Sequence, residues 1–557
     1  MALLVLGFLM WNQWQQDYNR PGATSAQLPV ITDNVPSSTS RTATPDIPST
    51  EQADLPEAVS AYSVDDTPPI AVAAPTSRRV TVITDTLSVE IDLIGATIVG
   101  AKLLNYPVEL SNPDVTVTLM ADTGDKYLVA QSGLISANRQ APNHTSTYQS
   151  DADEYRLKQG AEELYVPLTW ESDDGLEVTK TFIFHRGRYD IEVRHDISNR
   201  SDSIWNGNRY DQLQRTRPGD ADKRSFTNPG RYSYVGGALY SPQEKFEKVD
   251  FDEIAEGDIG HSTAGGWLAM IQHYFFTAWI PPEAEINAYS TQAVGGNGGT
   301  RYLLRAVSQP VNIEAGGQHS FSSSFYVGPK LQDKLDTVAE GLSLTVDYGI
   351  FTIFSKPLFW LLSNIHKFVG NWGWSIILLT LLIKLAFFKL SEAQYKSMAK
   401  MRKLQPRIES LKERHGDDRQ KMSQAMMEIY KKEKVNPLGG CLPILVQIPI
   451  FIALYWVLLE SVELRQAPFI GWITNLSARD PYFILPVLNG VFMIITQRMT
   501  PSPGMDPMQR KIMSSLPIVF SVMFAFFPAG LVLYWATNAG LSLLQQWYIT
   551  RKIVAMN

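Results

Sequence analysis

The sequence predicts a chain in two parts, an all-β sandwich followed by an α-helical polytopic membrane region, which with an N-terminal anchor makes six spans. Its 557 residues exceed what one hydrophobic core organises. Residues 1–350 carry 45 acidic and 26 basic side chains, whereas residues 351–557 carry 11 and 23. Short alternating runs fill the first part, and apolar runs of 16 to 22 residues fill the second. This asymmetry argues against a plain cytosolic enzyme and against a general nucleic-acid binder. A single cysteine, Cys441, excludes an internal disulfide and a cysteine-based zinc site.

Residues 1–17 contain a short apolar run, ALLVLGFLMW, with aromatic residues at its end. Ten residues are too few for a bilayer crossing, which needs about 20. The basic start and small-residue cleavage site of a signal peptide are both missing, so we interpret the run as an uncleaved membrane anchor with a clipped or misassigned start. Residues 18–78 are rich in Pro, Ser and Thr, which predicts a disordered tether.

Residues 79–346 alternate apolar and polar side chains, as in RRVTVITDTLSVEIDLIG, between Gly, Asn and Asp turns. This pattern predicts a large antiparallel sandwich, and helical spacing at 332–346 predicts a helical link to the membrane region. His185 and His195 fall on one predicted strand, about 33 Å apart, too far to act together. No clustered spacing indicates a metal ligand set, so we expect no catalytic residues, metal or cofactor. A carbohydrate-active enzyme is an alternative that would require a carboxylate cluster in the sandwich.

Residues 350–371 predict an amphipathic helix lying along the bilayer surface, with Leu358, Leu361, Leu362, Ile365 and Phe368 on one face. A second span follows at 372–391. The remaining four spans and a short tail occupy 437–557, with apolar runs at 438–459, 481–497, 511–526 and 529–549.

The segment between the second and third spans predicts orientation. Residues 392–434 carry twelve basic and seven acidic side chains, which favours the cytosol and places loop 460–480 and the sandwich outside. Residues 392–436 have apolar residues at helical spacing on both sides of a His-Gly-Asp-Asp break, which predicts a helical hairpin. Its Met-rich surface either packs on itself or binds cytosolic partners or anionic lipid. The Met residues of this partner surface are Met398, Met401, Met422 and Met426.

Lys384 lies inside the second span, and no acidic residue lies in any span. A cation in a membrane costs at least about 2.5–3.5 kcal/mol unless it is solvated or paired. Lys384 therefore either snorkels to cytosolic water or faces a polar cavity, and polar residues on neighbouring spans favour the cavity. These polar residues are Thr380, Gln447, Asn489, Thr496, Gln497, Thr537 and Asn538. A cavity open to the cytosol around an unpaired cation suits an incoming polypeptide. A solute transporter stays a second alternative, because Pro443 and Pro449 could break the third span.

Seven stretches together resemble the YidC family of Gram-negative inner-membrane protein insertases, over about residues 350 to 550. They are VGNWGWSII, AQYKSMAKMRKLQP, KVNPLGGCLPILVQIPIF, SVELRQAPFIGWI, LSARDPYFILP, DPMQRKIM and FPAGLVLYW. The sandwich is similar to that family's periplasmic domain, which resembles the galactose mutarotase fold.

The resemblance implies a five-helix insertase core with a polar groove open to cytosol and lipid. It places the family's positive residue at Lys384, substrate contacts at Thr380, Tyr534 and Trp535, and a groove glutamine at Gln497. It also implies an inner-membrane location, a periplasmic sandwich and no cofactor. The partners it implies are nascent membrane proteins, the Sec translocon, the ribosome, the signal recognition particle receptor and the phospholipid bilayer, with no direct nucleic-acid contact.

Three departures from the family pattern stand out. Lys384 replaces the usual Arg, which keeps the charge but loses the forked donor geometry. Lys389 stands where many members have Pro, so we expect a straighter helix at the cytosolic end of the second span. The chain ends soon after Arg551 and Lys552, without the usual basic tail, which argues against ribosome docking through that tail.

Overall fold

A computed structural model describes residues 78–123, 126–219, 233–257, 260–296, 299–415, 419–433, 442–500 and 507–555. The anchor predicted at 1–17 lies outside the described residues, as does the tether predicted at 18–78 except for its last residue.

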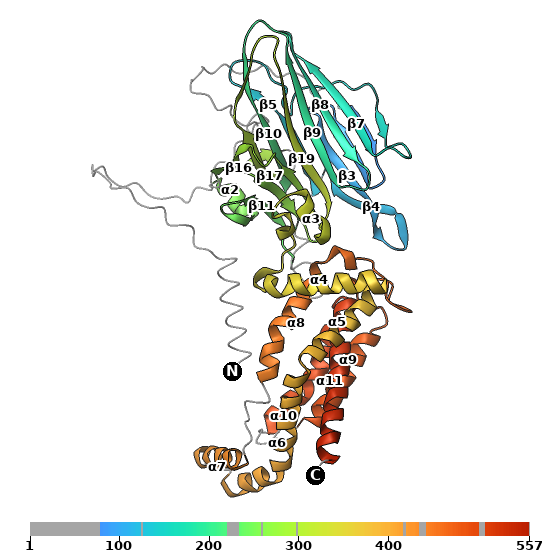
Figure 1. The fold of residues 1–557 in the computed structure, drawn as a ribbon, viewed down its shortest axis with the longest axis vertical. Coiled ribbons are helices and arrows are strands. Elements are labelled where there is room, and N and C mark those ends of the chain that lie inside the picture. Colours follow the sequence, from blue (N-terminus) through green and yellow to red (C-terminus); the bar gives the residue numbers. More distant parts are fainter. Residues whose placement is uncertain are drawn as a thin grey trace, which may run out of the picture. The chain divides into compact units, whose positions relative to one another are not determined.

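The strands form two packed sheets, so the predicted all-β sandwich is confirmed (Figure 1). The larger sheet runs in the order β13-β16-β17-β10-β5-β3-β2-β1-β6, with β18 beside β10 and β4 beside β3. The smaller sheet runs in the order β12-β11-β14-β15-β19-β9-β8-β7. The strands of the larger sheet are β1 (Arg79–Ile83), β2 (Leu87–Asp92), β3 (Thr97–Glu109), β4 (Asn112–Met120), β5 (Leu128–Ser136), β6 (Glu154–Arg156), β10 (Trp205–Thr216), β13 (Gly260–Ala264), β16 (Ile286–Gly296), β17 (Gly299–Ser308) and β18 (Val311–Ile313). Those of the smaller sheet are β7 (Glu163–Glu171), β8 (Leu176–His185), β9 (Asp190–Asn199), β11 (Gly236–Ser241), β12 (Lys245–Val249), β14 (Trp267–Ile271), β15 (Phe275–Ile280) and β19 (Gln318–Pro329).

The sandwich core comes from the alternation seen in the sequence. In β2, Leu87, Val89 and Ile91 are buried while their neighbours are half-buried, because successive side chains point to opposite faces of a strand. Trp267 of β14 and Trp279 of β15 are also fully buried. A helix, α2 (Phe251–Glu256), begins at a capping box on Asp250.

The prediction that His185 and His195 share one strand is wrong. They lie on the antiparallel neighbours β8 and β9, joined by a turn in which Gly187 has a φ of 68°. His195 pairs across the ladder with Lys180, and His185 pairs with Glu163 of β7. The apolar alternation continues across both strands, so the turn around Gly187 was not recognised and the two strands were predicted as one.

The link after the sandwich is helical but broken. It contains α3 (Gln332–Val338) and two 3-10 turns, η4 (Leu342–Thr345) and η5 (Gly349–Phe351). Gly341, with a φ of 73°, separates α3 from η4. Its positive φ is costly for other residues, which explains the break.

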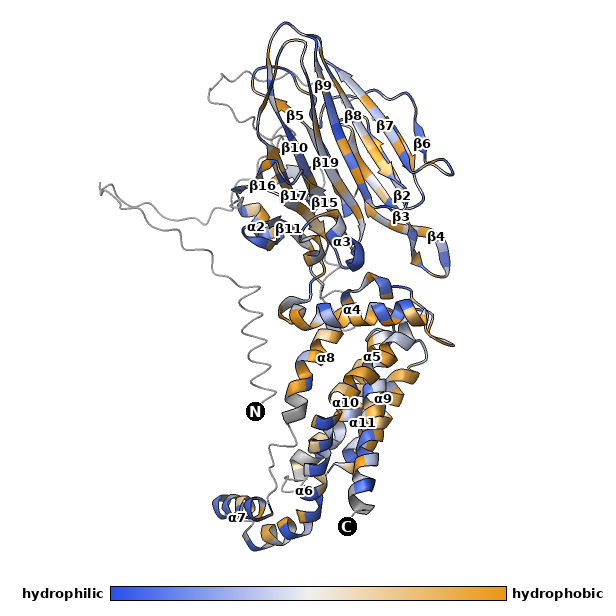
Figure 2. Cartoon of the chain, viewed as in Figure 1, coloured by the Kyte–Doolittle hydropathy of each residue, from blue (hydrophilic) through white to orange (hydrophobic). Residues whose placement is uncertain are grey.

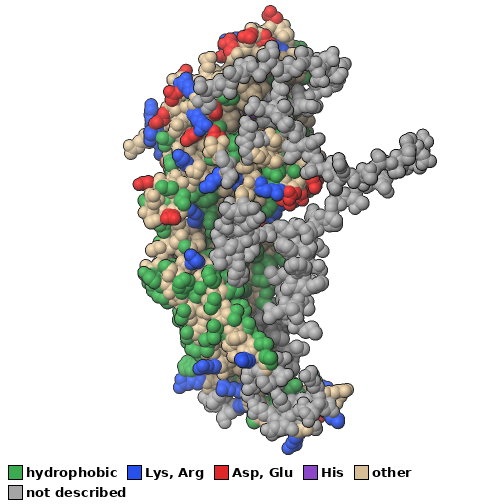
Figure 3. Space-filling model, turned by 180° about the vertical axis from the view of Figure 1, so that it is seen from behind, with side chains coloured by type: hydrophobic (Ala, Val, Ile, Leu, Met, Phe, Trp, Pro, Cys, Tyr) green, Lys and Arg blue, Asp and Glu red, His purple; other side chains and the backbone are tan. Residues whose placement is uncertain are grey.

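The remaining chain is helical. Its helices are α4 (Thr352–Val369), α5 (Trp372–Ala386), α6 (Phe388–His415), α7 (Arg419–Lys432), α8 (Leu442–Glu460), η7 (Val462–Leu464), α9 (Ile484–Met499), α10 (Pro507–Phe524) and α11 (Ala529–Ala555). Figure 2 shows α8 largely hydrophobic, whereas α6 and α7 carry many hydrophilic residues. Figure 3 shows apolar side chains gathered over the helical region on one face, with Lys and Arg at one end of it.

The face predicted to lie on the bilayer along α4 is only partly correct. Leu362 is buried, and Leu358, Leu361 and Ile365 pack against the core, because α4 contacts α5 and α8. Phe368 instead is 93% exposed. The exposed face of α4 includes Ile353, Pro357, Trp360, Asn364 and Phe368. The predicted face is partly covered by protein because α4 is apolar on two faces, and the sequence alone does not assign one of them to protein.

The chain bends by 67° between α5 and α6, so the expectation of a straighter helix near Lys389 is wrong. Phe387, at the bend, has φ −92° and ψ 11°. Among the described helices, no single one meets the length and hydropathy expected of a membrane crossing; the bent pair Trp372–Ala386 and Phe388–Leu404 meets it together.

Candidate functional site

The ammonium of Lys384 lies where three helices meet. Its Nζ donates a hydrogen bond to the Ser542 hydroxyl of α11 at 2.7 Å. That hydroxyl in turn donates to the Asn538 carbonyl at 2.6 Å, so its lone pairs face the ammonium. The Tyr395 hydroxyl of α6 donates to the Ser542 carbonyl at 3.3 Å. The structure thus links Lys384 through Ser542 to the backbone carbonyl of Asn538, and the sequence analysis missed both Ser542 and Tyr395.

Lys384 has no carboxylate within ion-pair distance among the residues that the structure describes. Lys389, five residues later, is exposed and lies 3.8 Å from the Glu392 carboxylate. The two lysines of the same segment therefore differ in kind: one contacts a neutral hydroxyl between helices, and the other lies in a solvated ion pair.

Local capping and packing place Lys384. Asn371 caps α5 by accepting from the Trp374 amide at 3.1 Å, and its amide group donates to the Phe469 carbonyl at 3.1 Å. Gly373 lies against the Phe469 ring, where an added Cβ would clash. These contacts fix the start of α5, and its packing against α11 then sets which side of the helix faces Ser542.

A polar stripe runs along α11 through Asn538, Ser542, Gln545 and Gln546. The spacing of four, seven and eight residues puts these side chains on one helix face. Both side-chain polar atoms of Gln545 and the Gln546 carbonyl oxygen are buried without a hydrogen-bond partner in the described part of the chain. Buried amide groups without partners are costly, so this stripe suits water or a polar ligand. The spacing is readable from the sequence TNAGLSLLQQ and could have identified these residues.

The other predicted groove residues make hydrogen bonds or contacts of their own, away from the Lys384–Ser542 contact. Thr380, one turn before Lys384, is buried and its hydroxyl donates to the Ile376 carbonyl at 2.7 Å. Gln497 donates to the Met513 carbonyl of α10, and Asn489 is buried with its amide 3.7 Å from the Met493 sulfur. Gln447 is half-buried in α8.

Tyr534 and Trp535 lie in an aromatic cluster. Both side chains are buried. The Trp535 ring contacts the rings of Phe451, Phe524 and Phe527 from α8 and the α10–α11 hairpin, at centroid distances of 5.6, 3.8 and 5.5 Å. In this arrangement they join α8, α10 and α11 into one core.

The predicted hairpin has a small apolar seam. Leu404 and Ile408 of α6 are buried, and Met401, Met426 and Ile429 pack against them. Met398 is half-buried, and the side chain of Met422 lies outside the described residues. The Arg407 guanidinium lies 2.6 Å from the Glu433 carboxylate across the hairpin.

The sandwich interior holds charged side chains that are buried and bonded to other groups of the protein. Arg209 and Asp211 are fully buried with Nε to carboxylate oxygen at 2.9 Å, and Arg209 also reaches Glu285 at 3.1 Å. Lys180 donates to the carbonyls of Ala96 and Ser132, and burial lowers its pKa to about 7. No group of three metal-binding side chains occurs in the described ranges. These residues form a structural polar core rather than an open site.

The α8–α9 connector, residues 461–480, is hydrogen-bonded to the sandwich and to the link that follows it. The Arg465 guanidinium and the Gln466 amide both donate to the Pro107 carbonyl of β3, at 2.7 and 2.8 Å. The Gln332 amide donates to the Glu463 carboxylate at 3.2 Å, and burial raises the pKa of Glu463 to about 7. At the end of α8, the Ser233 hydroxyl donates to Glu460 at 2.9 Å.

Comparisons with known proteins cover both parts of the chain. Residues 79–361 match the family described as YidC periplasmic domain, and residues 364–556 match the family described as 60Kd inner membrane protein. The chain is 49% identical over 548 residues to the membrane protein insertase YidC of Methylococcus capsulatus, covering 98% of this chain and 95% of that one. It is 48% identical over 568 residues to the one from Thioalkalivibrio sulfidiphilus, covering 99% and 97%. A solved structure described as an active YidC insertase with its first transmembrane domain resolved aligns with 85% of this chain and 93% of its own, at 18% identity and a TM-score of 0.38.

The fold and these matches define a two-part protein of the 60Kd inner membrane protein class, with the YidC periplasmic domain ahead of the helical region. Within that class, the chain belongs to the YidC family of membrane protein insertases. The predicted family and function are confirmed, and members of this family reside in the inner membrane.

Proposed function

We propose that Lys384, Ser542 and the polar stripe of α11 form the surface that receives a nascent membrane segment during insertion. The observation that carries this proposal is the ammonium of Lys384, hydrogen-bonded to a neutral hydroxyl rather than to a carboxylate. A hydroxyl orients the cation without cancelling its charge. The cation therefore stays available to an acidic group that arrives from outside the protein.

The physical benefit to a substrate is electrostatic. Two opposite unit charges 4 Å apart attract by about 4 kcal/mol at an effective dielectric constant of 20. An acidic residue carried into apolar surroundings without a partner bears a desolvation cost of at least that order. Lys384 offsets part of this cost for a translocated acidic tail, and the unpartnered side-chain NH2 group of Gln545 supplies a further hydrogen-bond donor.

The wider arrangement is part of the same proposal. Helices α5, α8, α9, α10 and α11 cross the inner membrane as the insertase core, and the N-terminal anchor adds a sixth span. The sandwich lies in the periplasm and the α6–α7 hairpin in the cytosol, where its basic side chains follow the positive-inside rule. The substrates are nascent membrane proteins, received alone or beside the Sec translocon. The hairpin is the surface for the ribosome and the signal recognition particle receptor.

Substitution of Lys384 tests the groove. We expect K384A to lower the insertion of a substrate with an acidic translocated tail by about tenfold or more, the factor that 1.4 kcal/mol represents. K384R should insert it at the rate of the unchanged protein, because the charge is kept. The measurement is protease protection of the tail in proteoliposomes.

The matched control is K389A, which removes a lysine of the same segment that already has a carboxylate neighbour. It should leave insertion unchanged, as should K384A for a substrate with an uncharged tail. Equal insertion of the acidic-tailed substrate by all four proteins would refute the role of Lys384.

A further inference from the structure

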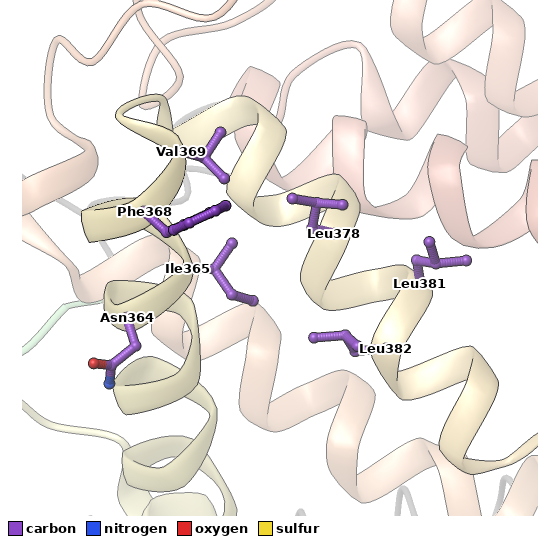
Figure 4. A pocket seen from close by; sticks show the side chains of 7 residues that line it. All are labelled: Asn364, Ile365, Phe368, Val369, Leu378, Leu381 and Leu382. Carbon is purple, nitrogen blue, oxygen red and sulfur yellow. The ribbon is translucent and has the colours of Figure 1, made fainter.

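A cavity of about 370 Å³ lies between α4 and α5, and Lys384 is not among the residues that line it. Figure 4 shows its lining, in which Ile365 and Phe368 of α4 face Leu378 and Leu382 of α5. The lining residues are Asn364, Ile365, Phe368, Val369, Leu378, Leu381 and Leu382. None of the predicted groove residues is among them, so this cavity is a separate feature of the helical region.

The cavity continues two exposed apolar faces. On α4, the exposed residues include Ile353, Pro357, Trp360, Asn364 and Phe368, spaced three or four residues apart on one side of the helix. On α5, Leu378, Leu381, Leu382 and Leu385 are exposed. Phe368 and Leu382 belong both to these faces and to the cavity lining. The cavity is thus a notch in a continuous apolar surface, which in a membrane insertase faces lipid.

The dimensions favour a lipid chain over a peptide. The lining runs from Leu378 to Leu382 on α5 and from Asn364 to Val369 on α4, which is about 6 and 7.5 Å of helix. A membrane-spanning helix is about 10 Å across and 30 Å long, so it could not enter such a notch. A flexible, unbranched chain could follow it.

The polar groups around the notch fit an amphiphile. Asn364 lies at its edge, and Lys367 precedes Phe368 with its ammonium 3.3 Å from the Asp333 carboxylate. An amide and a solvated lysine–aspartate pair next to an apolar notch match the boundary between a zwitterionic phospholipid headgroup and its chains.

We infer that the notch between α4 and α5 binds one acyl chain of a membrane glycerophospholipid. The inference rests on the proposed membrane placement of α5. Since surrounding lipid is equally apolar, the chain is held by close packing against Phe368, Leu378 and Leu382 rather than by the hydrophobic effect. The lipid chain lies between the C-terminal end of α4 and the middle of α5.

The test uses the full chain in vesicles of phosphatidylethanolamine and phosphatidylglycerol that contain a phosphatidylcholine with a diazirine in its acyl chain. After irradiation, mass spectrometry maps the adducts. We expect adducts on the notch residues at roughly threefold or more the yield on Leu385, which is 59% exposed but outside the notch. L382W fills the notch and should remove that excess, whereas L385W should leave it intact.

Each other outcome is informative. Equal labelling of the notch and Leu385, unchanged by L382W, would mean surrounding lipid only and would overturn the inference. Displacement of the notch adducts by a stalled nascent chain would assign the notch to substrate and also overturn it. Absence of adducts on all of α5, Leu385 included, would refute the membrane placement itself. Insertion by L382W in the same vesicles verifies that the variant is folded.

Discussion

At the scale of residues, the chain holds buried or half-buried cations in two different ways. In the sandwich, Arg209 is fully buried against Asp211 and also reaches Glu285. Burial, the largest effect, raises the pKa of Asp211, and the neighbouring Arg209 opposes it. In the helical region, Lys384 contacts a hydroxyl. The first arrangement neutralises charge for structure, and the second keeps charge available for a partner.

Removing one member of the buried Arg209–Asp211 pair should therefore strongly lower the stability of the folded chain. R209M leaves Asp211 buried without its cation, which costs about 3–5 kcal/mol in comparable cases. The control R194M breaks an exposed pair with Asp196, worth at most about 1 kcal/mol. We expect a large fall in the apparent melting temperature of the full chain for R209M and little change for R194M. Similar melting temperatures for the two variants would contradict a structural role for the buried pair.

The sequence reveals the chemistry of these residues better than their partners. Lys384 is recognisable from the sequence as a cation without an acidic partner, because it lies in an apolar run and none of these runs contains an acidic residue. Its contact with Ser542 depends on how α5 and α11 are rotated against each other, which side-chain packing decides. The polar spacing from Asn538 to Gln546 is visible in the sequence, but only the structure shows that its amides lack partners.

At the scale of elements, the α8–α9 connector couples the helices to the sandwich. Arg465, Gln466 and Glu463 all bond to backbone groups of the first 332 residues. Glu460 at the end of α8 is buried too, and burial raises its pKa although the neighbouring Lys330 opposes this effect. Two buried carboxylates with raised pKa values make this connection sensitive to pH.

The direction of this pH dependence follows from proton binding to the folded chain. The folded chain holds a proton on Glu463 up to about pH 7, whereas the ordinary value is 4.5. The stability that this proton contributes is therefore complete below about pH 4.5 and is lost as the pH rises toward 7. We expect residues 461–480 to show greater hydrogen-exchange protection at pH 5 than at pH 8, after correction for intrinsic exchange.

E463Q should weaken this pH dependence, with Glu460 supplying what is left. E283Q, at an exposed position of the sandwich, should not alter it. Protection that is the same at both pH values in the unchanged protein would show that neither carboxylate is protonated in the folded state.

Elements with one clear hydrophobic pattern were predictable from the sequence, whereas features that depend on which neighbours a helix packs against were not. The strands follow from alternation, and the hairpin from its interrupted stripe. The exposed position of Phe368 and the 67° bend at Phe387 were not predicted, because both depend on which neighbours α4 and α6 pack against. The break at Gly341 is the kind of boundary that a glycine can signal in advance.

At the scale of the whole molecule, the insertase function rests on family membership, and its mechanism rests on one face of α11. A charge held by Ser542, unpartnered amides one turn further on and a bent α5–α6 pair lie along the same helices. The apolar notch lies on another side of α5. Substrate and lipid would then meet the protein on different surfaces of one helix.

The most direct measurement places a photoreactive amino acid at Gln545, on the polar stripe, or at Leu544, which is exposed next to it. Each variant is irradiated with a stalled single-span nascent chain that has an acidic tail. The proposed groove predicts a strong crosslink from position 545, a weak one from position 544, and loss of the first when K384A is added. A stronger crosslink from position 544, or one from position 545 that K384A leaves unchanged, would contradict the groove.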